Sequence, residues 1–136
     1  MKPPGVLVAV AAGGALGAPA RYGLAQLVGV GAGGFPWATF WTNVSGSLAL
    51  GLVLVLVVER FPPSRYVRPF VAVGFLGAYT TFSTFAVEVD LLVKDGHAET
   101  ALVYVVASLV GGFAAVACGI LLGRRVPVGR RRSPPR

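Results

Sequence analysis

The chain has 136 residues, of which 55% are hydrophobic and 12% are charged, and its mean hydropathy is +0.76. A water-soluble domain of this size cannot cover its surface with so few charged side chains, so the composition excludes that class. Together with a net charge of +7, the composition favours one basic domain that crosses a lipid bilayer.

Four apolar segments are expected to form membrane spans, near residues 5–30, 37–58, 67–93 and 98–122. Each is long enough for a bilayer core of about 30 Å, which takes about 20 helical residues. The sequence therefore predicts an all-α membrane protein with four transmembrane helices. Residues 1–125 are expected to form the transmembrane domain, and residues 126–136 a basic, disordered tail.

The first span begins after Lys2 and contains Ala18-Pro19-Ala20, a combination that imitates a cleavable signal peptide. Against cleavage, Gly13 and Gly17 have the small-residue spacing of a helix that packs closely against another helix in a membrane. Arg21 lies late in this span. An arginine at that depth is either part of a functional site or extends its side chain to the headgroups, and both interpretations stay open.

The polar residues of the second span gather in its first half, and the second half is a nearly pure Leu/Val run. They are Thr39, Thr42, Asn43, Ser45 and Ser47. This cluster suggests a vestibule or pore wall, although Ser and Thr also join helices to one another in membranes. The Asn43 amide is too polar to face lipid and has two N–H donors, which indicates a pore or site role.

The third span contains a run of glycine and hydroxyl residues from Gly74 to Phe85. In hydrocarbon a helix break is tolerated only where it lines a cavity or is buried in protein, so the run predicts a break near the middle of the span. Glu88 and Asp90 follow toward the end of this span, where acidic side chains suit an aqueous mouth.

On the fourth span Tyr104, Ser108 and Gly112 recur every four residues and therefore share one helix face. A second row contains only small residues: Gly111, Ala115, Gly119 and Gly123. This row predicts a close helix contact. The single cysteine, Cys118, lies in the same span and excludes a disulfide within the chain.

Ten of the 12 basic residues lie before the first span, between the second and third spans, or after the fourth, whereas the opposite side has only Lys94. Because Lys and Arg favour cytoplasmic loops, both termini are predicted to be cytoplasmic. The Arg-rich tail could contact anionic lipid or nucleic acid, or could serve only as a topology anchor. We expect no nucleic-acid partner.

No enzyme site is indicated by the sequence. It has one histidine and one cysteine, without carboxylates at metal-ligand spacing or a glycine-rich loop after a strand. We therefore expect the chain not to be an enzyme.

Three stretches together resemble the Fluc (CrcB) family of microbial fluoride channels. They are Gly13–Tyr22, Thr39–Asn43 and Gly74–Phe85, and the resemblance extends over all four spans. It implies passive export of fluoride across the cytoplasmic (inner) membrane, which lowers cytoplasmic fluoride. It also implies an antiparallel dimer of four-helix subunits in contact with membrane lipid, with a structural sodium ion at the dimer interface.

The resemblance also implies roles for individual residues. Asn43 corresponds to a pore-lining donor, Phe82 and Phe85 to an aromatic pair at the ion path, and Tyr104 and Ser108 to a polar track on the last helix. Ser83, Thr84 and Thr39 are further hydroxyl candidates. The backbone carbonyls of Gly77 and Thr80 correspond to sodium ligands. Arg21 and Glu88 are structural or vestibule candidates. Many members have another hydroxyl where this chain has Gly112.

Orientation is where the chain departs from the family pattern. A dimer of one chain inserted both ways up requires a weak charge bias, but the bias here is strong. The partner is therefore either a second copy or an oppositely oriented homologous chain.

Two other classes compete with the channel interpretation. A small multidrug-type antiporter would require a carboxylate in the first span, and none occurs there. A noncatalytic membrane assembly subunit would use the small-residue rows only for packing.

Overall fold

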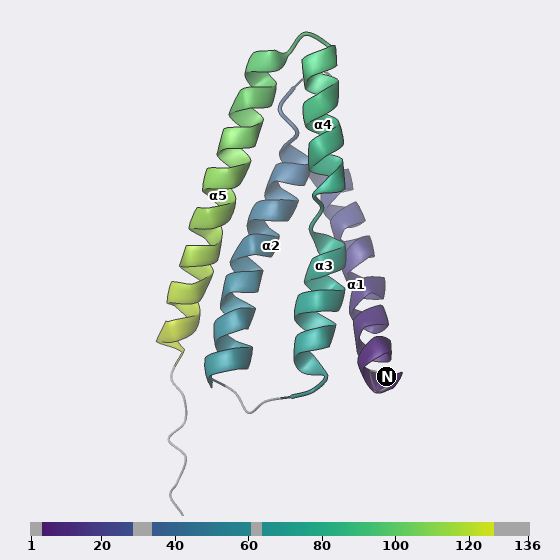
Figure 1. Cartoon of the computed structure of the whole chain (residues 1–136), viewed down its shortest axis with the longest axis vertical. Helices are drawn as coiled ribbons and strands as arrows, with labels where there is room; N and C mark the ends of the chain where they lie inside the picture. The colour runs from purple at the N-terminus through teal and green to yellow at the C-terminus, as the bar shows by residue number, and fades with distance from the viewer. Residues whose placement is uncertain (1–3, 29–33, 61–63, 127–136) are drawn as a thin grey trace, which may run out of the picture.

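The structure is a computed structural model that describes residues 4–28, 34–60 and 64–126 (Figure 1). In chain order its elements are α1 (Pro4–Val28), α2 (Trp37–Val55), η1 (Leu56–Arg60), η2 (Pro69–Phe75), α3 (Leu76–Tyr79), α4 (Ser83–Lys94) and α5 (Ala98–Arg125). The elements η1 and η2 are π-helices, and the others are α-helices. The part of the tail from residue 127 to residue 136 lies outside the described residues.

Four helical stretches of this structure are long and apolar enough to cross a membrane: Pro4–Val28, Trp37–Val55, Pro69–Lys94 and Ala98–Arg125. They agree with the predicted spans to within a few residues. The chain is therefore a four-span, multi-pass membrane protein, as the sequence predicted. The third span is composed of η2, α3 and α4 in succession.

The first span packs against η2 through glycines. A Cβ atom on Gly13 would collide with the carbonyl oxygen of Phe70, and one on Gly17 would collide with that of Phe75. The two backbones are therefore in direct contact, which explains why this face of α1 has no side chains. The close approach predicted from the small-residue spacing is present, and Gly13 and Gly17 are buried.

The second and fourth spans meet through the other predicted row of small residues. Gly119 lies against the Leu48 carbonyl of α2, and Gly123 lies against the side chain of Val55. In the reverse direction, Gly51 of α2 lies against the Val116 carbonyl of α5. Figure 1 shows α5 and α2 running side by side along this contact.

The helical conformation is interrupted between α3 and α4. Thr80 is extended, with φ −77° and ψ 159°, and α4 begins at Ser83. The non-helical residues are therefore 80–82, and Gly77 lies inside α3. Gly77 has a conventional negative φ, and a Cβ on it would meet nothing within 4 Å.

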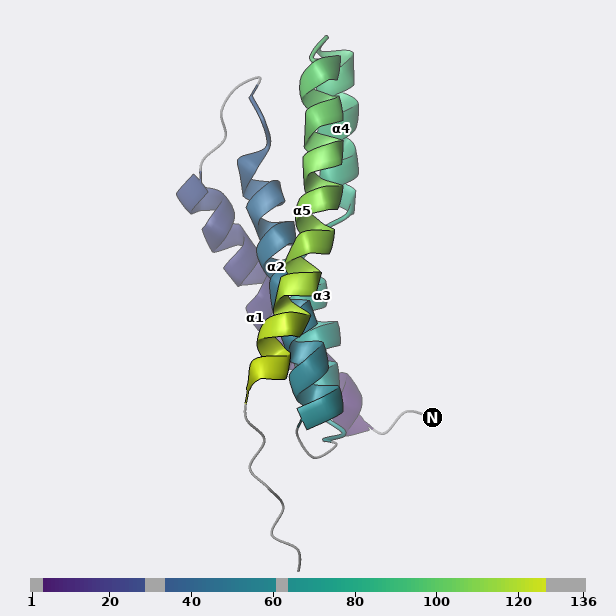
Figure 2. The same ribbon diagram turned by 90° about the vertical axis from the view of Figure 1, so that its left-hand side faces the viewer.

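The ends of the molecule differ in charge. The start of α1, residues 64–68 before η2 and the end of α5 lie at one end (Figure 1), and Arg65, Arg68, Arg124 and Arg125 are exposed. At this end, Glu59 Oε1 lies 3.7 Å from Arg124 Nη2. At the opposite end α4 turns into α5, next to the exposed ion pair between Asp90 and Lys94. Figure 2 shows that α1 and α2 diverge from α4 and α5 toward this second end.

Candidate functional site

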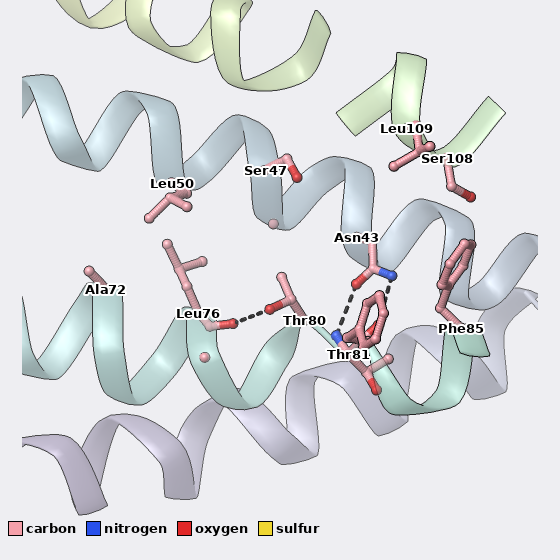
Figure 3. A pocket seen from close by; sticks show the side chains of 13 residues that line it. Asn43, Ser47, Leu50, Ala72, Leu76, Thr80, Thr81, Phe85, Ser108 and Leu109 are labelled. Carbon is pink, nitrogen blue, oxygen red and sulfur yellow. Dashed lines mark hydrogen bonds between the residues drawn. The ribbon is translucent and has the colours of Figure 1, made fainter. Parts of the chain in front are cut away.

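The interrupted backbone is held by Asn43. Its Nδ2 donates to the Thr81 carbonyl, and its Oδ1 accepts from the Thr81 N–H, both at 2.9 Å (Figure 3). The side-chain amide thus replaces the backbone partners that Thr81 would have in a continuous helix. A primary amide has two N–H donors, so one remains after the bond to Thr81.

Hydroxyl groups cap the two helix ends at the interruption. Thr80 Oγ1 donates to the Leu76 carbonyl at 2.9 Å, which closes α3. Thr81 Oγ1 accepts from the Thr84 N–H at 3.2 Å and donates to Thr84 Oγ1 at 2.9 Å, which fixes the start of α4. Thr81 belongs to the Gly74–Phe85 run, but no role was predicted for it, although a threonine just before a helix is a typical cap residue.

These bonds divert two donors from their usual acceptors. In an α-helix the N–H of Thr81 would pair with the Gly77 carbonyl, and the N–H of Thr84 would pair with the Thr80 carbonyl. Here the first donates to Asn43 and the second to Thr81 Oγ1. The carbonyls of Gly77 and Thr80 therefore lack their ordinary helical partners. Both residues line a cavity between α2, α5 and the third span.

A cavity of about 420 Å³ opens along the interruption between α2, α5 and the third span. Its polar lining residues are Asn43, Ser47, Thr80, Thr81 and Ser108 (Figure 3). Phe82 and Phe85 also line it. Ser108 Oγ is buried without a hydrogen-bond partner in the described part of the chain. A buried hydroxyl without a partner is unusual in a folded protein, and this one belongs to a residue that lines the cavity.

The two predicted phenylalanines lie together at this cavity but differ in exposure. Their ring centroids are 6.0 Å apart. Phe82 is 80% exposed, whereas Phe85 is partly buried and packs against Tyr104 with centroids 5.0 Å apart.

A second cluster forms behind Phe85. Glu88 accepts hydrogen bonds from Thr39 Oγ1 at 2.8 Å and from the Tyr104 hydroxyl at 2.7 Å. Tyr104 is fully buried, and Thr39 is buried as well. The structure thus joins three predicted residues, of which Glu88 is partly buried.

Another cavity, of about 240 Å³, lies between α1, α2 and the start of α4. It is lined by Arg21 and by four threonines: Thr39, Thr42, Thr81 and Thr84. Arg21 therefore lies near the interruption from the side of α1. Ser83 is exposed, and its hydroxyl is 3.4 Å from Thr81 Oγ1.

The structure separates the predicted residues into neighbouring groups. The cavity of about 420 Å³, called the main cavity below, is lined by Asn43, Gly77, Thr80, Phe82, Phe85 and Ser108. The adjacent hydrogen-bonded cluster contains Thr39, Glu88 and Tyr104. Ser47 was recognised in the polar cluster of the second span but was not predicted as a site residue. Its spacing of four residues from Asn43 was the available signal.

Comparison with known proteins gives the family. The family described as CrcB-like protein, Camphor Resistance (CrcB), matches residues 8–120. The chain belongs to the CrcB family. The resemblance inferred from the motifs is therefore confirmed.

Curated relatives of this CrcB protein have consistent names. The chain is 51% identical to "Fluoride-specific ion channel FluC 3" of Streptomyces avermitilis, over 94% of this chain and 63% of that protein. It is 39% identical to "Fluoride-specific ion channel FluC 2" of Nocardia farcinica, over 95% of this chain and 92% of that protein. It is 44% identical to "Fluoride-specific ion channel FluC" of Paracoccus denitrificans, over 85% of this chain and 91% of that protein. The chain thus spans less than two thirds of the Streptomyces relative.

Proposed function

We propose that this protein is a fluoride-selective channel that lets fluoride leave the cell passively, and that it is not an enzyme. The observation that carries the proposal is the cavity at the interruption of the third span, where the unpaired Ser108 hydroxyl and a spare Asn43 N–H occur in a chain whose relatives are named fluoride channels. An inside-negative potential drives an anion outward by about 2.3 kcal/mol per 100 mV, so export needs no other energy source.

Donors without fixed charge suit fluoride transport. Fluoride is small and strongly hydrated, so a pore must replace its water with hydrogen-bond donors. The second N–H of Asn43 and the Ser108 hydroxyl can donate without binding the anion as tightly as an ammonium group would. Conduction requires sites that bind favourably yet release the ion.

The phenylalanine pair supports selectivity. The edge of an aromatic ring is the positive part of its quadrupole, so Phe82 and Phe85 can present polarised C–H groups to an anion. Their rings also keep the wall apolar and narrow. Chloride is larger and accepts hydrogen bonds less strongly, and such a wall therefore penalises it.

The neighbouring cluster supports the same path. We assign Tyr104 and Thr39 to a polar track continuous with Ser108, and Glu88 to holding both hydroxyls by the bonds described above. Ser83 and Thr84 are assigned as hydroxyl contributors near the interruption, and Arg21 as a vestibule residue that attracts anions from the side of α1.

A structural sodium ion fits the carbonyls at the interruption. We propose that Gly77 and Thr80 hold it through their backbone oxygens, which have lost their helical donors to Asn43 and Thr81. Hard oxygen ligands suit a hard cation, and if a second subunit buries these oxygens, each carbonyl without a partner would cost about 1–3 kcal/mol. Within the described ranges, no group of three or more His, Cys, Asp or Glu side chains could hold a metal ion, so the carbonyls are the available ligands.

An antiparallel dimer explains the open side of the main cavity. In a single chain Asn43, Thr80 and Ser108 would border a cavity open to the lipid, where unsatisfied polar groups are costly. A second subunit would cover the cavity and the exposed Phe82 ring. It would also place the interrupted third span of each subunit next to that of the other, with the sodium ion between them.

The charge distribution suggests where the chain sits and with what. Exposed arginines at the end that contains the start of α1 and the end of α5 favour a cytoplasmic position for that end, in the cytoplasmic (inner) membrane. With such a bias, we favour an oppositely oriented homologous chain as the dimer partner over a second copy. Exposed apolar side chains on the outer faces would contact membrane lipid.

The competing classes are less compatible with the site. A small multidrug-type antiporter needs a membrane carboxylate in its first span, but α1 has no acidic residue. A noncatalytic assembly subunit would not need an unpaired buried hydroxyl at a polar cavity. Fluoride efflux from liposomes that contain the purified protein, with chloride as the control anion, separates these functions.

A further inference from the structure

Ser47 occupies a position in the main cavity that the family resemblance does not assign. It lies one helical turn after Asn43 on α2, and both residues line the cavity. Figure 3 shows Ser47 between Leu50 and Asn43 on α2, on the side of this helix where Ser108 of α5 lies. The α2 helix therefore presents a polar row, Asn43 then Ser47, parallel to the row on α5.

The α5 row loses its side chain next to Ser47. Gly112 follows Ser108 by one turn, and a Cβ atom on Gly112 would lie 3.7 Å from Ser47 Oγ. This is an ordinary van der Waals distance, so the Ser47 hydroxyl lies directly beside the position where a side chain at residue 112 would begin. At the level where α5 contributes only backbone, α2 thus contributes a hydroxyl.

The hydroxyl of Ser47 differs from that of its neighbour Ser45. Ser45 Oγ donates to the Trp41 carbonyl at 2.6 Å and lies 2.8 Å from the Tyr79 hydroxyl, so it is fully engaged. Within the described part of the chain, Ser47 Oγ has no hydrogen-bond partner. Serine inside a helix commonly bonds to the carbonyl four residues earlier, as Ser45 does, so the free hydroxyl of Ser47 is available to a ligand.

We propose that Ser47 is a further fluoride-binding hydroxyl, which continues the ion path across from α5 to α2 where Gly112 leaves the α5 row without a side chain. The inference rests on the proposed function. A hydroxyl at this position serves an anion for the same reason as Ser108 does, because it donates without carrying a charge and can rotate as the ion passes.

The test measures fluoride efflux from liposomes for four forms of the chain: the unmodified protein, S47A, S47A/G112S and S45A. Each form is reconstituted together with the same oppositely oriented homologous chain. Loss of one donor from the ion path predicts about tenfold slower efflux for S47A. The double variant is expected to recover most of the rate, because the added hydroxyl is carried by a Cβ 3.7 Å from Ser47 Oγ. S45A is the matched control and is expected to transport as the unmodified protein does. A purely structural role of Ser47 would not be rescued from the opposite helix.

The unmodified protein separates the two claims, because its efflux tests the proposed function directly. If it transports fluoride and S47A transports equally fast, the role of Ser47 is overturned while the channel function stands. A slow S47A that G112S fails to restore also overturns the proposal. If S47A does not elute from a sizing column as the unmodified protein does, S47C replaces it, since it preserves volume and weakens the donor. Severalfold slower efflux of S47C supports the proposal, and an unchanged rate contradicts it.

Discussion

The side-chain amide of Asn43 forms two hydrogen bonds of 2.9 Å with the backbone N–H and carbonyl of Thr81. One residue of α2 thereby holds the point at which the third span stops being helical. Asn43 is consequently both a structural partner of the interruption and, through its second N–H, a donor to the cavity. Its two roles make it the residue whose replacement is expected to have the widest effect.

Replacing Asn43 by aspartate is expected to suppress fluoride transport. The variant keeps an acceptor for the Thr81 N–H but places a carboxylate against the Thr81 carbonyl and removes both N–H donors. Loss of this partner should also lower the free energy of unfolding by about 1–3 kcal/mol. Efflux and thermal unfolding in detergent measure the two effects. Near-normal flux at neutral pH would remove Asn43 from the ion path.

The two phenylalanines are expected to respond differently to replacement by isoleucine. Phe82 is 80% exposed in the single chain, so F82I should reduce flux with little change in subunit stability. Phe85 contacts Tyr104 with ring centroids 5.0 Å apart, so F85I should reduce flux and also cost about 1 kcal/mol of stability. Flux and unfolding temperature are measured on the same preparations. Unchanged flux in both variants would exclude the ring edges from the mechanism.

Glu88 and Tyr104 are expected to be energetically coupled. In Y104F the Glu88 carboxylate loses the 2.7 Å bond from the Tyr104 hydroxyl, which should destabilise the protein by about 1–3 kcal/mol. In the E88Q background the same replacement should cost less, because no charged acceptor is left short of a donor. A double-mutant cycle on unfolding free energies measures this difference. If the losses of unfolding free energy in Y104F and E88Q simply add in the double variant, the hydrogen bond between Tyr104 and Glu88 does not contribute to stability.

Glycine packing can be tested without reference to transport. G119V should prevent stable folding, because its side chain would enter the backbone of α2 at Leu48. G23A is the matched control, since a Cβ on Gly23 meets nothing within 4 Å. Expression level and elution profile report the outcome. Equal behaviour of the two variants would contradict the close contact between α2 and α5.

Expressed alone, the chain is expected to insert in one orientation. Deleting Val126–Arg136 removes four arginines and leaves six basic residues on the predicted cytoplasmic side against Lys94, so the orientation should survive the truncation. Cysteines placed at the termini of a C118A background are labelled from each side of the membrane. Comparable labelling from both sides would show dual insertion and contradict the need for a second, oppositely inserted chain.

Local patterns predicted the fold more fully than the site. The four spans and both glycine contacts followed from hydropathy and small-residue spacing, because these depend on the helix period alone. The bond between Asn43 and Thr81 did not, since it joins residues 38 apart in sequence, and the sequence contains no signal for which donor replaces a helical bond.

The partnership of Glu88 with Thr39 and Tyr104 was equally invisible in the sequence. Each of the three residues was a candidate for its own reason, and only the packing of α2, α4 and α5 brings them together. Ser47 was likewise present in a recognised cluster, but its distinction from Ser45 depends on which hydroxyl is already bonded.

The central claim is tested most directly by fluoride efflux from liposomes reconstituted with the purified protein, alone and together with an oppositely oriented homologue. We expect rapid release of fluoride, little release of chloride, and faster fluoride release from the mixed preparation than from the chain alone. Failure of both preparations to release fluoride above protein-free liposomes, or equal release of chloride, would contradict it.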